Sequence, residues 1–155
     1  MIAEKDFKHA MAQWASGISV ITTLDGAGAP VGFTATSLSS VSLNPPMILF
    51  CLSEKSGVFQ AFKNASGFIV NILGAEHQAW SQRFAGAQED RFNGVPTKPG
   101  LEGFPLLDGA IATLECQTKA TYPGGDHLIF LGEVLRVGSR KGAPLLYYSG
   151  GYHHL

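Results

Sequence analysis

The chain has 155 residues and a formal net charge of -1, with 45% hydrophobic and only 15% charged residues. A chain of this length forms one domain that buries about two-thirds of its unfolded surface. No run of Lys or Arg occurs, which argues against a nucleic-acid partner. The longest strongly apolar run, 47–52, is far short of the ~20 residues of a membrane span. We therefore expect a single domain over 1–155, without a membrane or nucleic-acid partner, and the low charge favours an oligomer.

The N-terminus and the cysteines indicate the compartment. Residues 1–9 have no basic start followed by an apolar core, so no signal peptide is predicted. Cys51 and Cys116 lie far apart, each inside a strand-like stretch. We interpret them as two buried thiols in a reducing, cytoplasmic environment, with a disulfide or a catalytic cysteine as the alternatives.

The first predicted element is a helix. Apolar residues from Phe7 to Trp14 recur at i, i+3, i+4 and i+7, which places them on one face. Asp6 is expected to cap the start of this helix and Gly17 to end it. Such a pattern predicts an amphipathic helix.

The remainder of the chain alternates short strands with turns. Strands are predicted over 18–24, 31–36, 47–53, 68–73, 110–122, 127–137 and 145–148, and further helices over 56–64 and 76–85. Residues 86–106 are loop-like, and a loop of this length is usually functional or mobile. Because hairpins join most of the strands, we expect an antiparallel barrel with helices at its ends, not a doubly wound sheet.

A hydroxyl-rich segment, TATSLSSVSLNPP over 34–46, follows the second predicted strand. Its backbone donors and hydroxyls suit a planar polar ring edge, a ribityl chain or a phosphate. The alternative is an ordinary Ser-rich turn.

Two shorter features also suit a ligand. Lys55 and Ser56 stand at the predicted start of a helix, where free N–H groups favour anions, although an ordinary helix cap gives the same pattern. Asp126 is placed to orient His127 at the end of a tight turn, although a lone His near a turn is most often a surface residue.

Other chemistries lack their motifs. His127, His153 and His154 do not have the spacing of zinc ligands, so no metal is expected. The chain contains no G-x-S-x-G elbow, no Walker loop and no complete dinucleotide fingerprint. These absences exclude a Rossmann-type reductase.

The chain resembles the flavin reductase family of two-component flavin-dependent monooxygenases along almost its whole length. The matching segments, in order, are FKHAMAQWASGISVITT (7–23), TATSLSSVSLNPP (34–46), MILFCLS (47–53), 68–73, SQRFA (81–85), GDH (125–127) and 147–152. The resemblance implies a mainly β fold, an antiparallel Greek-key split β-barrel with two or three short helices, the FMN-binding split barrel. It also implies a homodimer that reduces FMN or FAD with NADH or NADPH and supplies reduced flavin to a separate monooxygenase.

The resemblance also implies roles for particular residues. The flavin-binding residues would be Thr34, Ala35, Thr36, Ser37, Ser40, Val41, Ser42, Cys51, Leu52, Ser53, Lys55, Ser56, Arg83 and Phe84, with Lys55 and Ser56 at the phosphate. His127 and Tyr152 would face the nicotinamide, and His127 would take the catalytic part by placing that ring or balancing charge on reduced flavin.

Several alternatives stay open at this point. The same barrel suits a non-enzymatic FMN-binding electron carrier, another flavoenzyme acting on an organic substrate, or a structural barrel without flavin. Gly57 and Val58 stand where the family often has a Thr, which leaves FMN against FAD undecided. The absence of an Arg cluster leans toward NADH.

Overall fold

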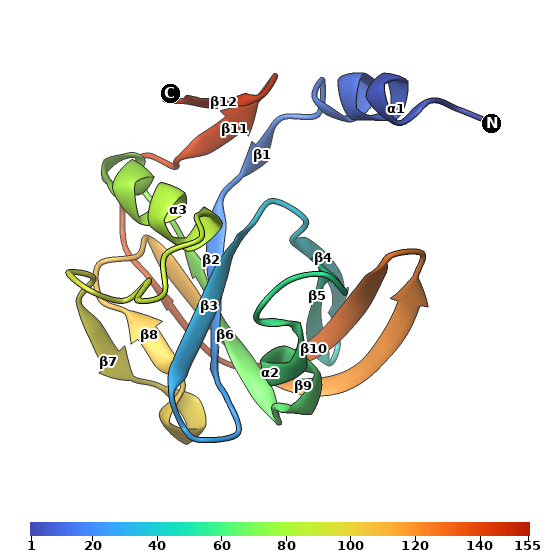
Figure 1. Cartoon of the computed structure of the whole chain (residues 1–155). Helices are drawn as coiled ribbons and strands as arrows, with labels where there is room; N and C mark the ends of the chain where they lie inside the picture. The colour runs from blue at the N-terminus through green and yellow to red at the C-terminus, as the bar shows by residue number, and fades with distance from the viewer.

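An antiparallel sheet of seven strands forms the body of the protein (Figure 1). In the computed structural model, which describes residues 1–155, these strands are β2 (Ser19–Leu24), β3 (Pro30–Ala35), β4 (Ser39–Leu43), β5 (Pro46–Ser53), β6 (Gly67–Ile72), β9 (Ala112–Gly124) and β10 (His127–Ser139). Their order in the sheet is β3-β2-β6-β9-β10-β5-β4, and each neighbouring pair is antiparallel. The prediction of a mainly β, antiparallel fold is confirmed.

Smaller elements surround the main sheet. β1 (Ser16–Gly17), β11 (Leu146–Tyr148) and β12 (Gly151–His153) form a three-stranded sheet, and β7 (Thr97–Pro99) pairs with β8 (Pro105–Leu107). The helices are α1 (Glu4–Met11), α2 (Phe59–Asn64) and α3 (Gln78–Ala85), with 3-10 turns η1 (Ala75–His77) and η2 (Leu101–Gly103). None of these helices is long and apolar enough to cross a bilayer. Figure 1 shows α1, β11 and β12 at one end of the molecule, above the main sheet.

Most strands lie where β-branched and aromatic residues predict them, but two regions differ. β4 was not predicted, because its hydroxyl residues lack the apolar alternation of a strand. The segment 86–106, predicted as a loop, contains β7 and η2 and leads into β8. The buried Glu115 carboxylate accepts a hydrogen bond from the backbone N–H of Leu101, which fixes this segment against β9.

A cluster of phenylalanine rings forms the larger core. Phe50 and Phe130 are fully buried and stack at 4.8 Å between ring centroids, and Phe62 and Phe68 meet Phe50 edge-on. Gly132 makes this packing possible, since a Cβ there would lie 2.4 Å from the Phe68 ring. The cluster sits behind β3 and β5 and supports the ends of both strands.

The predicted amphipathic helix exists, but its apolar face is uncovered. Phe7 is 60% exposed, Met11 52% and Trp14 74%, and α1 contains no buried residue. Within the single chain, no other element buries this face. The predicted boundaries also need correction: α1 starts after Ala3, with Asp6 inside it, and ends at Met11, well before Gly17.

Both cysteines are unpaired thiols, as expected. Cys116 is buried and Cys51 is half-buried. Burial raises the pKa of the Cys51 thiol and raises the pKa of Cys116 to about 12. Both thiols are therefore protonated at neutral pH, which removes them as nucleophiles.

Candidate functional site

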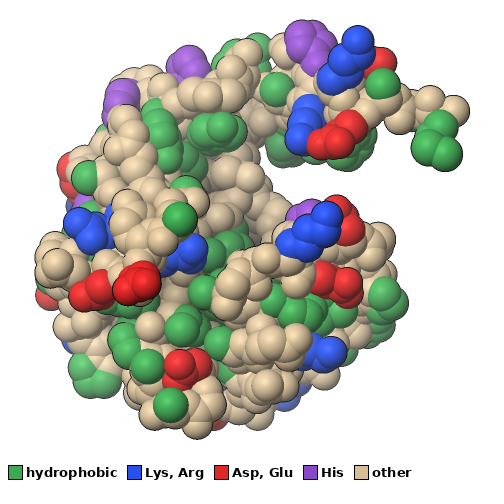
Figure 2. All heavy atoms as spheres, viewed as in Figure 1, with side chains coloured by type: hydrophobic (Ala, Val, Ile, Leu, Met, Phe, Trp, Pro, Cys, Tyr) green, Lys and Arg blue, Asp and Glu red, His purple; other side chains and the backbone are tan.

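A hollow of about 360 Å³ lies between the end of β3 and the end of β5. Residues 33–37 form one wall, residues 51–53 and Ser56 form the other, and His127 stands at the rim. The pairing of β10 with β5 places His127 opposite Ser53, which brings the rim to this wall. The volume is in the range of small-molecule sites, about 300–1,000 Å³. Figure 2 shows the molecule deeply indented between the end that carries α1 and the main sheet.

The hydroxyls of the β3 wall have different partners. Thr34 Oγ1 donates to the Ser81 carbonyl at 2.6 Å. Ser37 Oγ accepts from the Cys51 backbone N–H and donates to the Cys51 carbonyl, which ties this wall to β5. Thr36 is exposed and its hydroxyl has no partner within the chain. The Thr36 side chain is therefore the one most available to a ligand on this wall.

The opposite wall ends in two serines suited to an anion. Ser53 Oγ accepts the Lys55 backbone N–H and Ser56 Oγ accepts the Val58 backbone N–H. Because each oxygen is used as an acceptor, its own hydroxyl proton remains to donate to a phosphate. Lys55 lies between them, is exposed and adds positive charge. α2 begins only at Phe59, later than predicted, so these groups belong to the turn before it.

His127 is held by its neighbour. Its Nδ1 lies 2.7 Å from Asp126 Oδ1, and the two side chains are 43% and 79% exposed. The hydrogen bond from His127 lowers the pKa of the Asp126 carboxyl. The carboxylate therefore orients the ring with Nε2 left for a ligand at the rim.

Some predicted flavin-binding residues lie outside the hollow. Ser40, Val41 and Ser42 are on the edge strand β4 and do not line it. Ala35 and Leu52 border the hollow, but they are 5% and 3% exposed and their side chains belong to the core. At these two positions the main chain forms the wall.

The two residues expected to close the site from α3 have other partners. Phe84 is 1% exposed and packs with Leu73, Leu107 and Leu145 in a second core cluster. Arg83 donates to the carbonyl of Asp90 and so supports the segment after α3. In the single chain Phe84 is a core residue, while Arg83 is half-buried beside the segment after α3.

Tyr152, expected at the nicotinamide, does not share the hollow with His127. It is half-buried on β12, and its hydroxyl lies 2.9 Å from Ser81 Oγ. Its ring meets Tyr147 edge-on at 5.8 Å. Tyr152 thus joins the C-terminal hairpin, formed by β11 and β12, to α3.

A second cavity of about 590 Å³ adjoins the hollow and shares Thr36 and Ser37 with it. Its other lining residues are mainly aromatic or apolar and come from α1, the turn after it and the C-terminal hairpin: Phe7, Met11, Trp14, Tyr147 and Tyr148. Sequence reasoning missed these residues because an apolar helix face is ordinarily a core face. The two cavities together offer a hydroxyl-lined space beside an aromatic one.

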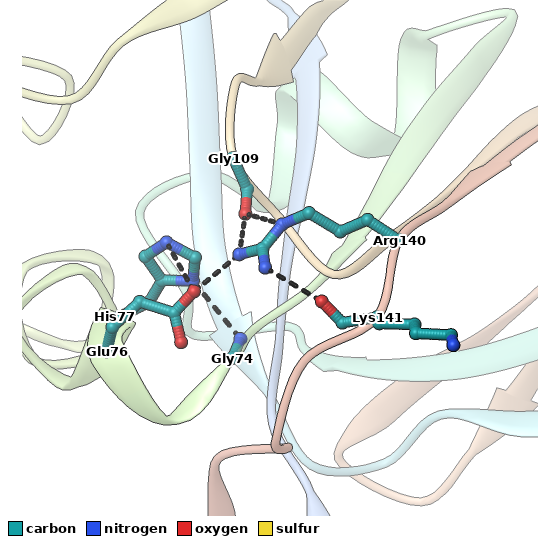
Figure 3. A network of polar contacts seen from close by, with 6 residues as sticks. All are labelled: Gly74, Glu76, His77, Gly109, Arg140 and Lys141. Atoms are coloured by element: carbon teal, nitrogen blue, oxygen red, sulfur yellow. Dashed lines mark hydrogen bonds and ion pairs between the residues drawn. The ribbon is translucent and has the colours of Figure 1, made fainter.

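A polar network around Arg140 lies in a different part of the fold (Figure 3). The guanidinium donates to the carbonyls of Gly109 and Lys141 and pairs with Glu76. His77 Nδ1 accepts the Gly74 N–H, and its ring stacks on Trp80 at 4.0 Å. None of these residues lines either cavity, so the network holds the start of α3 against the ends of β8 and β10.

Comparison with known proteins places the chain in a family. Residues 11–155 match the flavin reductase like domain, so the chain belongs to this family. The predicted resemblance and the class of enzyme, a flavin reductase, are thereby confirmed.

Individual relatives cover most of the chain. It is 40% identical over 141 residues to actinorhodin polyketide dimerase of Streptomyces coelicolor, across 90% of this chain and 80% of that protein. It is 35% identical over 152 residues to the reductase subunit HsaB of a flavin-dependent monooxygenase from Rhodococcus jostii, across 97% of this chain and 77% of that protein. The solved structure of Streptomyces globisporus NADH:FAD oxidoreductase SgcE6 with NAD and FAD fragments superposes with a TM-score of 0.92 at 33% identity. The match covers 100% of this chain and 96% of that chain.

Proposed function

We propose that this flavin reductase transfers a hydride from NADH or NADPH to FMN or FAD bound in the hollow between β3 and β5. The observation that carries the proposal is the pairing of hydroxyl-bearing walls, 34–37 and 51–56, with His127 at their rim. When bound, the flavin accepts the hydride that leaves C4 of the nicotinamide, and the cofactors carry that chemistry.

The donors of the hollow fit the parts of a flavin. Backbone groups of 34–37 and the free Thr36 hydroxyl suit the polar edge of the ring and the ribityl chain. Ser53 and Ser56, with their protons available, suit the terminal phosphate beside Lys55. A single Lys with two hydroxyls holds an anion only moderately, as a protein that must release reduced flavin requires.

The adjoining aromatic cavity suits the nicotinamide. It meets the hollow at Thr36 and Ser37, so a ring placed there lies against a flavin bound by the same residues. His127 Nε2 is available from the rim to orient the carboxamide or to balance charge. No arginine lines either cavity, which favours NADH, since Arg commonly holds the 2′-phosphate of NADPH.

The hydride step needs position more than acid or base catalysis. Both thiols are protonated, and apart from Cys51 the only titratable side chain that lines the hollow is His127, which Asp126 holds through Nδ1. The main contribution of the chain is to hold two rings at near-attack distance and to limit their motion.

We further propose a homodimer with the split-barrel fold. Phe7 and Met11 of α1 and Trp14 just after it are uncovered apolar residues that support a second copy as the occupant of this surface, together with Leu43 of β4 and Val137 of β10. Light scattering on the purified chain tests this proposal, with a mass of two chains as the expected result. A Trp14→Glu variant should shift the mass toward one chain, because a charge is costly in a buried interface.

The physiological partner in this proposal is a separate monooxygenase that receives reduced flavin by diffusion in the cytoplasm. The HsaB relative is described as the reductase subunit of such an enzyme. The open hollow and the two unpaired thiols support release of flavin and a reducing compartment.

The decisive experiment is a titration of NADH oxidation, followed at 340 nm, against FMN, FAD and riboflavin. Saturable turnover that requires added flavin and no other substrate is the expected result. Tight flavin binding without steady-state turnover would favour the electron carrier, and turnover only with an added organic substrate would favour another flavoenzyme. No binding of any flavin would overturn the proposal.

A further inference from the structure

Ser81, in the middle of α3, is hydrogen-bonded to two separate parts of the candidate site. Its carbonyl oxygen accepts from Thr34 Oγ1 on β3 at 2.6 Å, and its hydroxyl lies 2.9 Å from the Tyr152 hydroxyl on β12. Ser81 is fully buried, with 0% of its surface exposed. No other residue joins β3 to β12 by side-chain hydrogen bonds, while the backbone of the C-terminal hairpin is held by the pairing of β11 with β1.

Each side of Ser81 leads to a different cavity. Thr34 lines the hydroxyl-rich hollow. Tyr152 pairs in register with Tyr147, meets its ring edge-on at 76°, and so fixes an aromatic side chain that lines the adjoining cavity. Ser81 therefore connects the β3 wall of the hollow to the C-terminal hairpin, which lines the adjoining aromatic cavity.

We propose that Ser81 is a positioning residue for hydride transfer, setting the aromatic wall of the nicotinamide cavity at a fixed distance from the flavin wall. The inference rests on the proposed function, because it assigns the two rings to these two cavities. Ser81 touches neither ring and acts through Tyr152 and Tyr147.

The two bonds of Ser81 differ in a way that makes the inference testable. Thr34 bonds to the main chain of Ser81, and this bond survives a change of side chain. Tyr152 bonds to the hydroxyl, which an alanine removes. Ser81→Ala should therefore leave the flavin wall in place and free only the Tyr152 side chain, and with it the Tyr147 ring that it contacts, from its fixed position.

The size of the effect follows from the geometry of the reaction. A loss of orientation near the reacting atoms lowers the rate steeply, while a single neutral hydrogen bond has a modest net value. We expect Ser81→Ala to lower kcat/KM for NADH by about 5- to 30-fold, with the flavin Kd unchanged within about twofold.

The experiment is a double-mutant cycle on the full chain. Wild type, Ser81→Ala, Tyr152→Phe and the double variant are compared by kcat and KM for NADH at saturating flavin, and by flavin Kd from fluorescence quenching. Both single variants should lose similar activity, and the double variant should lose no more than either, because all three remove the same contact. The matched control is Thr23→Val, which removes another fully buried hydroxyl, bonded to the Gly67 carbonyl away from both cavities.

The outcomes separate this inference from the function on which it rests. A wild-type chain without flavin-dependent NADH oxidation overturns the proposed function and the inference with it. An active wild type with unchanged kcat/KM in the variants, additive losses in the double variant, or a loss equal to that of Thr23→Val overturns the inference alone. If Ser81→Ala does not fold, Tyr152→Phe removes the same hydrogen bond by changing the half-buried Tyr152 instead. Normal activity of Tyr152→Phe is then sufficient to reject the inference.

Discussion

Asp126 Oδ1, in the turn between β9 and β10, lies 2.7 Å from Nδ1 of His127, the first residue of β10. The contact lowers the pKa of the Asp126 carboxyl, so the carboxylate is charged at neutral pH and accepts the Nδ1–H. Nε2 is then an acceptor in the neutral ring and a donor in the protonated ring. Either form is able to orient an amide group at the rim of the hollow.

Replacing His127 should affect NADH more than flavin. We expect His127→Ala to lower NADH turnover by about 10-fold or more, the value of a lost hydrogen bond to a polar or charged group. Flavin should still bind, because the walls of the hollow are unchanged. Steady-state kinetics with flavin binding measured alongside tests this, and unchanged kinetics would remove His127 from the site.

The serine pair at the end of the hollow should distinguish flavins by their phosphate. Ser53→Ala or Ser56→Ala is expected to raise the Kd for FMN by roughly 10-fold, because each removes a hydroxyl donor to a charged acceptor. Riboflavin, which has no phosphate, should bind both variants as it binds wild type. Fluorescence titrations with the two flavins provide the measurement, and Ser66→Ala, a surface serine bonded to Glu102, is the control. Equal losses for riboflavin and FMN would place the phosphate elsewhere.

Phe84 should behave as a core residue and not as a ligand contact. Its ring is 1% exposed and meets Phe92 edge-on at 4.9 Å. Phe84→Leu should lower the free energy of unfolding by about 1–3 kcal/mol through imperfect repacking. Urea denaturation measures this change. A change in flavin affinity greater than about twofold in the folded variant would instead support a contact between Phe84 and the flavin.

The strands that build the hollow could be predicted because each has a local signal. β5 is a run of apolar residues, β3 follows the turn after the β-branched run of β2, and the hydroxyl-rich segment at 34–37 is visible in the sequence. Their meeting also depends on the register of β10 with β5, which places His127 opposite Ser53. Register between distant strands has no local signal, so the resemblance supplied what periodicity did not.

The residues that sequence reasoning misplaced share one physical cause. An apolar side chain at regular spacing indicates a face that must be covered, without indicating what covers it. Trp14 was expected on an apolar helix face and is 74% exposed, whereas Phe84 was expected at a ligand and is buried. Ser81 belongs to the matching segment 81–85, but no role was predicted for it, because a serine inside a helix shows its value only through the partners that the fold brings to it.

His77 should make the stability of the chain depend on pH in a defined window. It is 7% exposed, and burial lowers its pKa from the ordinary 6.5, against the raising effect of nearby Glu76 and together with the lowering effect of Arg140. Protonation of Nδ1 also breaks the hydrogen bond from Gly74 N–H. Below about pH 6.5, His77 therefore binds a proton in the unfolded chain but stays neutral in the folded chain until the pH reaches its lowered pKa. The stability contributed by the neutral ring is complete above pH 6.5 and is lost as the pH falls toward the lowered pKa.

The matching variant is His77→Gln, which keeps an acceptor for the Gly74 N–H and removes the titration. Urea unfolding at pH 7.5, 6.5 and 5.5 should show wild type losing on the order of 1 kcal/mol more than the variant across this range. The other four histidines are present in both proteins, so their titration cancels in the difference. The carboxyl of Glu76 has a pKa lowered by its hydrogen bond to Arg140, and it titrates below this window. Parallel stability curves for the two proteins would show that the buried imidazole accepts its proton without cost, against the contacts seen around it.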